Sequence, residues 1–134
     1  MPFWYDNDNQ SHLKYSEVTR TVTSPHDWAE NGVNTLSIWC ISDWDWDNNV
    51  SANDAESMYI VLNGNAVVYN DDPDIAKVYN WTEWRIDLHK FTDLGIDLTN
   101  VHTIGIGFGN RDNPQSGGNG LMSFDDIRVY LPTR

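Results

Sequence analysis

The sequence predicts an all-β protein, a two-sheet antiparallel β-sandwich of the jelly-roll type with about eight strands and one or two short helical turns. Three observations lead to this fold class. Short segments rich in β-branched and aromatic residues recur along the chain, turn-forming residues separate them, and no segment has the period of a long helix. A chain of 134 residues with no internal repeat or linker is expected to form one domain, 1–134.

The first part of the chain supplies three of the expected strands. Residues 3–5 form a short opening strand, and residues 15–22 alternate between apolar and polar side chains, as a half-buried strand does. Ser24 and Pro25 are typical of the start of a single helical turn. Residues 35–41 are apolar on both parities, which predicts a central strand that is covered on both faces.

A hairpin and a strictly alternating strand follow. Residues 57–62 and 66–69 flank Asn-Gly-Asn at 63–65, a sequence typical of a tight β-turn. In residues 81–88 apolar side chains alternate with charged ones, which predicts one buried and one wet face. A short helical turn is expected at 89–91.

The next strand, residues 102–109, has two different faces. Large apolar side chains from Ile104 to Phe108 occupy every second position, and Gly105 and Gly107 lie between them. Glycine removes the side chains that another layer or a ligand would otherwise meet. We therefore expect this sheet to be packed on one side and to be open, polar or occupied on the other.

Charge and composition exclude several classes of function. Lys and Arg number 8 against 20 Asp and Glu, so the net charge is −12 and the surface repels nucleic acid and anionic membranes. Neutral ligands, cationic ligands and calcium are compatible with this charge. No apolar run is long enough to span a membrane, and the first residues lack the pattern of a signal peptide. Cys40, the one cysteine, is expected to be a buried, inert thiol.

Aromatic residues beside carboxylates are candidates for sugar binding. Trp44 and Trp46 lie in a polar loop, where indole rings are costly to expose without a purpose; alternatively, the loop folds back and buries one ring. Trp39 lies on a strand with two apolar parities, so it faces either the core or the open surface. The expected ligand-binding residues are aromatic, acidic or basic and lie mostly in loops: Trp44, Trp46, Asp71, Asp72, Tyr79, Trp81, Arg111 and Asp112.

The last expected strand, residues 121–130, contains a candidate calcium site. Its apolar residues are out of phase across Asp125 and Asp126, which predicts a β-bulge. Adjacent carboxylates repel each other unless a cation holds them, and Arg128 or calcium would serve; alternatively, both are solvated. The loop 43–54 also has the oxygen spacing of a calcium loop, although it lacks the glycine and helices of an EF-hand.

Catalytic signatures are weak. The histidines show no paired ligand spacing, and the sequence has no serine-centred elbow, phosphate loop or redox cysteine pair. Arg111 and Asp112 would orient a substrate or hold their own loop in place. We therefore do not expect an enzyme.

Four segments together resemble the galactose-binding-like jelly-roll domains of secreted bacterial proteins, a fold shared by many carbohydrate-binding modules. They are residues 81–88, 98–101, 104–109 and 124–130, the last with the sequence Phe-Asp-Asp-Ile-Arg-Val-Tyr. The resemblance implies a non-catalytic role in binding polysaccharide, an extracellular location and a structural calcium near the last strand, held here by Asp125 and Asp126.

Two other function classes remain as alternatives to polysaccharide binding. One is a calcium-stabilised structural or adhesion module, and the other is a small glycoside hydrolase or polysaccharide lyase. The resembled domains begin with an additional strand, which this chain lacks before Phe3. An unpaired sheet edge would result, so we expect two copies to pair edge to edge or to exchange their first strands as a homodimer.

Overall fold

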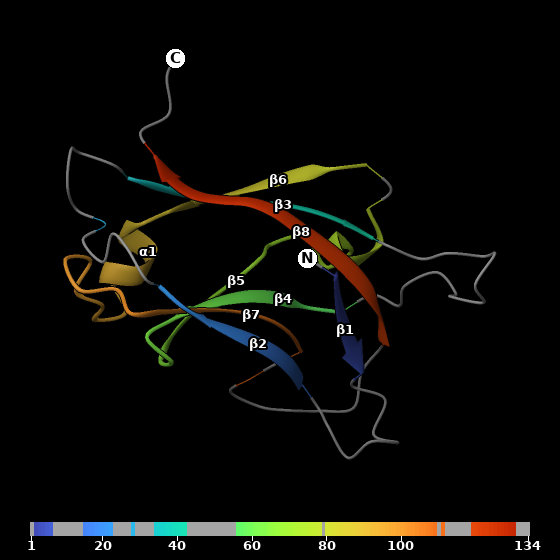
Figure 1. The fold of residues 1–134 in the computed structure, drawn as a ribbon, viewed down its shortest axis with the longest axis horizontal. Coiled ribbons are helices and arrows are strands. Elements are labelled where there is room, and N and C mark those ends of the chain that lie inside the picture. Colours follow the sequence, from blue (N-terminus) through green and yellow to red (C-terminus); the bar gives the residue numbers. More distant parts are fainter. Residues whose placement is uncertain are drawn as a thin grey trace.

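The computed structural model describes residues 2–6, 15–22, 28, 34–42, 56–78, 80–109, 111 and 119–130. Within these ranges the chain forms two four-stranded antiparallel sheets, which Figure 1 shows as two layers. The predicted β-sandwich is therefore confirmed. The strands are β1 (Pro2–Asp6), β2 (Tyr15–Thr21), β3 (Thr35–Ser42), β4 (Met58–Leu62), β5 (Ala66–Tyr69), β6 (Thr82–Asp87), β7 (Thr103–Gly109) and β8 (Asn119–Tyr130).

The two sheets have different strand orders. Sheet A has the order β1-β8-β3-β6, and sheet B has the order β2-β7-β4-β5. The helix α1 (His89–Thr92) confirms the turn expected after the alternating strand. A 3-10 helix, η3 (Ile75–Lys77), lies between β5 and β6, where the sequence analysis predicts no helical turn. The helical turn expected at Ser24 and Pro25 lies outside the described residues.

The core lies between the sheets and follows the predicted alternation. In β6 and just after it, Ile86 and Leu88 are buried, while Trp84 is partly buried and packs against the core. The rings of Phe108 in β7 and Phe124 in β8 join the two sheets, with centroids 6.2 Å apart. Because burial disfavours a charged thiolate, it raises the pKa of Cys40 to about 11.

Two predicted local features are present. At the β4–β5 turn, Asn63 and Gly64 have φ angles of 52° and 76°, the left-handed conformation that a tight hairpin requires. In β8, Asp126 has a φ of 52°, and the register with β3 shifts between Ser37 and Trp39. Two β8 residues, Asp126 and Ile127, therefore stand opposite one β3 residue, which is the expected bulge.

The glycine face of β7 is occupied by side chains from β4. A Cβ atom at Gly107 would lie 2.2 Å from Cζ of Tyr59, and one at Gly105 would lie 2.6 Å from Cγ1 of Val61. Tyr59 and Val61 pair directly with these glycines across the sheet. Gly107 thus makes room for the fully buried ring of Tyr59, and Gly105 makes room for the side chain of Val61.

The β1 strand covers part of one edge of β8. It pairs with Asn119–Ser123, ending at the pair of Pro2 with Ser123. Beyond Ser123, β3 is the one strand that pairs with β8 among the described residues. No helix within those residues is long and apolar enough to cross a membrane.

The packing of Tyr59 over Gly107 predicts that Gly107→Ala destabilises the fold. The added methyl would overlap the ring of a tyrosine that has no exposed surface to move into. We expect a loss of about 1–3 kcal/mol in the free energy of unfolding, measured by chemical denaturation. The same substitution in a Tyr59→Ala background should cost less, and an equal cost in both backgrounds would contradict this packing.

Homodimerisation through a sheet edge stays a prediction. For a homodimer we expect light scattering to give a mass near twice 15.4 kDa at tens of micromolar protein. The bulge in β8 opposes such pairing, because an extra residue interrupts the regular row of backbone donors and acceptors. A mass of one chain at every concentration would contradict the dimer.

Candidate functional site

Trp39 lies on the outer face of sheet A. Its neighbours in β3, Ile38 and Cys40, have no exposed surface and point into the core, so Trp39 points away from it. In register, Trp39 stands between Glu83 of β6 and Asp125 of β8. The sequence leaves open whether this ring faces the core or the open surface, and the structure places it on the surface.

A pocket of about 260 Å³ adjoins this ring, and we call it the tryptophan pocket. The described residues that line it are Trp39, Trp81, Asp125 and Asp126. Trp81 directly precedes β6 and is 47% exposed. The β3–β6 and β3–β8 pairings bring these side chains together from three separate segments of the chain.

The bulge determines how β8 presents its two carboxylates to the pocket. Oδ1 of Asp125 accepts a hydrogen bond from the backbone N–H of Asp126 at 2.8 Å. This bond fits the left-handed conformation of Asp126, which aspartate tolerates better than most residues. Asp126 is held in turn by Arg128, with 3.0 Å between Oδ2 and Nη2. Both aspartates are exposed and able to accept hydrogen bonds from a ligand.

A polar network lies beside Trp39 on the same face. Glu83 accepts hydrogen bonds from the hydroxyl of Ser37 and from Nε of Arg85, the latter at 2.8 Å. The side chain of Glu83 is only 16% exposed. Its carboxylate is thus fixed by neighbours on β3 and β6.

The described residues do not by themselves make a calcium site. Calcium takes about six to eight oxygen ligands, and the described residues contain no group of three or more acidic, histidine or cysteine side chains suited to a metal. Asp125 and Asp126 supply two carboxylates, one of which already pairs with Arg128. Calcium at these aspartates therefore stays a prediction that needs further ligands from elsewhere.

A second polar cluster lies on the outer face of sheet B, around Arg111. Nε of Arg111 lies 3.2 Å from Oε1 of Glu17, and its Nη2 donates to the carbonyl of Gly64 at 3.0 Å. Its backbone N–H donates to the hydroxyl of Tyr69 at 3.1 Å, and the hydroxyl of Tyr59 donates to Glu17 at 2.8 Å. We call these residues the Arg111 cluster. Arg111 thereby ties the end of β7 to β2 and to the β4–β5 hairpin.

The sequence missed the other members of the Arg111 cluster. Tyr59 and Tyr69 read as ordinary strand residues, and their rings meet edge to face with centroids 5.5 Å apart. One sequence feature points to Tyr59: Gly107 lacks a side chain on the outer face of β7, and the ring of Tyr59 fills the space that this leaves. Glu17 was recognised only as the polar side of an alternating strand.

The acidic loop before β6 has a local structural role. The backbone N–H of Asp72 donates to Asn70, and Oδ1 of Asp72 accepts from the N–H of Asp74 at 2.9 Å. These side-chain turns lead into η3. Asp71 and Asp72 are exposed, and their part in ligand binding stays a prediction.

The predicted site residues therefore divide into groups. Trp81, Asp125 and Asp126, predicted for different reasons, line one pocket, which Trp39 completes. Arg111 belongs to the opposite sheet. Four predicted residues lie outside the described part of the chain: Trp44, Trp46, Tyr79 and Asp112.

Comparison with known proteins bears on the fold. No protein-family model matches the sequence, and no curated protein matches it either. One solved structure with a similar fold is a family 11 carbohydrate-binding module from Clostridium thermocellum, in complex with a β-1,3-1,4-mixed-linked tetrasaccharide. The TM-score is 0.51 and the identity 13%, over 95% of this chain and 94% of that chain. The chain thus has the jelly-roll fold seen in a carbohydrate-binding module.

The calcium hypothesis predicts a higher melting temperature in millimolar calcium than in chelator, since a ligand that binds only the folded state stabilises it. In Asp125→Asn the difference should shrink. Asp93→Asn, at an exposed aspartate after α1, is the matched control and should keep the full difference. A melting curve that is the same in calcium and in chelator would leave Arg128 as the cation beside Asp126.

Proposed function

We propose that this protein is a non-catalytic module that binds polysaccharide at the tryptophan pocket. The observation that carries the proposal is the meeting of two outward indole rings, Trp39 and Trp81, with the carboxylates of Asp125 and Asp126 around one opening. These four residues are the described lining of a pocket of about 260 Å³.

The chemistry of these groups suits a sugar ring. The C–H face of a pyranose is apolar and packs on a flat aromatic surface, whereas its hydroxyl groups need hydrogen-bond acceptors at the rim. Trp81 and Trp39 supply the surface, and Asp125 and Asp126 supply the acceptors. Trp39 lies on a central strand of sheet A, so its backbone is already ordered and binding requires no ordering of a loop at this position.

Fold and charge support the same proposal. The jelly roll is shared with a module whose structure was determined with a bound tetrasaccharide. A net charge of −12 favours neutral glycans over anionic ones. An extracellular location is part of the proposal, because the polysaccharides of cell walls and matrices lie outside the cell.

The proposal predicts that Trp39→Ala and Trp81→Ala each weaken binding to a mixed-linkage β-glucan. Loss of one stacking ring should cost about 1–3 kcal/mol. Affinity electrophoresis and calorimetry measure the effect, and thermal melting checks that each variant folds. Leu94→Ala is the matched control, because Leu94 is 54% exposed but lies after α1, and it should bind as the wild type does.

Three outcomes would count against the proposal. If no neutral or acidic polysaccharide retards the protein, polysaccharide binding is removed. If binding survives both tryptophan substitutions but is lost in Arg111→Gln, the site lies at the Arg111 cluster instead. New reducing ends or unsaturated products after incubation with polysaccharide would show that the protein is an enzyme.

A further inference from the structure

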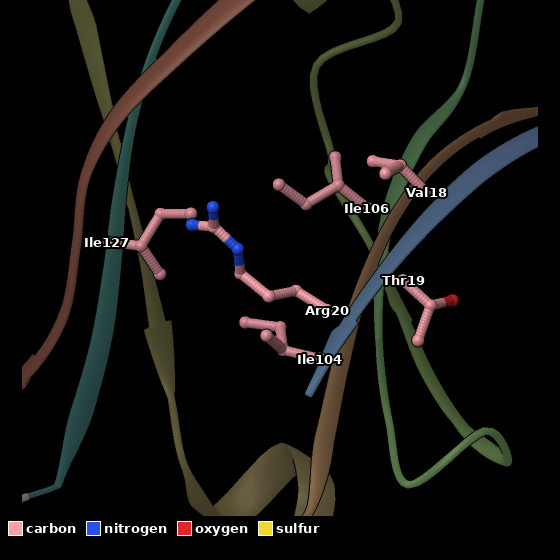
Figure 2. Close-up of a pocket in the computed structure, with 6 residues that line it drawn as sticks. All are labelled: Val18, Thr19, Arg20, Ile104, Ile106 and Ile127. Carbon is pink, nitrogen blue, oxygen red and sulfur yellow. The ribbon is translucent and has the colours of Figure 1, made fainter. Parts of the chain in front are cut away.

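A second cavity, of about 240 Å³, opens between the two sheets. Figure 2 shows its lining: Val18, Thr19 and Arg20 from β2, Ile104 and Ile106 from β7, and Ile127 from β8. We call it the inter-sheet cleft. It differs from the tryptophan pocket, which lies on the outer face of sheet A, and the two share no described residue.

The cleft is mostly apolar because it opens into the side of the core. Ile104 and Ile106 are 8% and 4% exposed and belong to the core cluster, against which Val18 packs. On the facing sheet, Ile127 is 38% exposed, an unusual exposure for a large aliphatic side chain that faces the core layer. The β1 strand pairs with β8 only as far as Ser123, so it does not extend over this part of the edge.

One arginine stands on the apolar side of this cleft. Val18 pairs with Ile106 and Arg20 pairs with Ile104 across the β2–β7 ladder, so Arg20 shares the parity of the core residues. Figure 2 shows its side chain extending from β2 across the cleft towards Ile127. Its aliphatic stem covers apolar surface while its guanidinium group stays accessible.

Arg20 differs from the other described arginines because it forms no ion pair with an acidic side chain among the residues that the structure describes. Arg85, Arg111 and Arg128 each form an ion pair, with Glu83, Glu17 and Asp126 respectively. Because acidic residues outnumber basic ones by 20 to 8, each arginine is expected to find an acidic partner. Within the described part of the chain, Arg20 is unpaired despite this excess. A guanidinium group binds a carboxylate through two parallel hydrogen bonds, and a carboxylate, unlike a phosphate ester, is readily carried on a small apolar body.

From these observations we propose that the inter-sheet cleft binds a small organic acid, a monocarboxylate with an apolar body of about the size of a phenyl ring. The carboxylate pairs with Arg20, and the body lies against Ile104, Ile106 and Ile127. The volume of about 240 Å³ is sufficient, because an apolar cavity of roughly 150 Å³ already holds benzene. This site is independent of polysaccharide binding.

A purely protective role for Arg20 makes a different prediction. β2 is an edge strand of sheet B, and a charge that points inward from an edge strand discourages another chain from pairing there. In that case the cleft takes no ligand, and removal of the charge promotes self-association. The experiment must therefore measure ligand binding and mass on the same variants.

The test uses 3-phenylpropanoate and its neutral analogue 3-phenylpropan-1-ol, titrated into the protein and followed by NMR chemical shifts. The wild type should bind the acid at least about tenfold more tightly than the alcohol, the difference expected of a charge-assisted pair. In Arg20→Gln this preference should disappear. Lys77→Gln removes an exposed cation outside the cleft and should leave the preference unchanged.

Binding of the acid with the preference lost only in Arg20→Gln supports the proposal. No binding of the acid at millimolar concentration, or equal binding of acid and alcohol by the wild type, overturns it. Self-association of Arg20→Gln by light scattering, together with no binding by the wild type, assigns Arg20 the protective role. Ile104→Val, a small reduction in cleft packing that the core tolerates, should weaken both probes equally.

Discussion

The bulge in β8 is the constraint on which both surfaces of sheet A depend. By placing Asp126 and Ile127 opposite a single residue of β3, it changes which side chains face out beyond Asp125. Asp125 and Asp126 line the pocket on the outer face, and Ile127 lines the cleft between the sheets. A regular strand would alternate strictly and could not present two successive carboxylates at one pocket.

Much of this fold was predictable because its patterns are local. Strict alternation of apolar and charged residues predicts β6, and an Asn-Gly pair predicts the hairpin between β4 and β5. The bulge is predicted because the alternation of apolar residues shifts by one position at Asp125 and Asp126. Each signal depends on neighbouring residues whose side-chain directions follow from backbone geometry. The 3-10 helix before β6 has no such local pattern, because Asn70 and Asp72 are equally typical of a simple turn.

The composition of the candidate site was only partly predictable because it depends on pairing between distant strands. Trp81 and the two aspartates were recognised singly, but their meeting depends on the registers of β6 and β8 against β3. The direction of Trp39 is ambiguous from the sequence because apolar residues occur on both parities of β3. The contacts of Arg111 with Glu17 and Gly64 join residues that are far apart in the chain, and they leave no local trace in the sequence.

The central claim, that a sugar ring binds on Trp39 and Trp81, is tested most directly by a crystal structure of the protein with a β-glucan tetrasaccharide. We expect a pyranose ring stacked on one or both indoles, with hydroxyl oxygens about 2.5–3.0 Å from the carboxylate oxygens of Asp125 or Asp126. A tetrasaccharide bound instead beside Tyr69 and Arg111, with the tryptophan pocket empty, would contradict it.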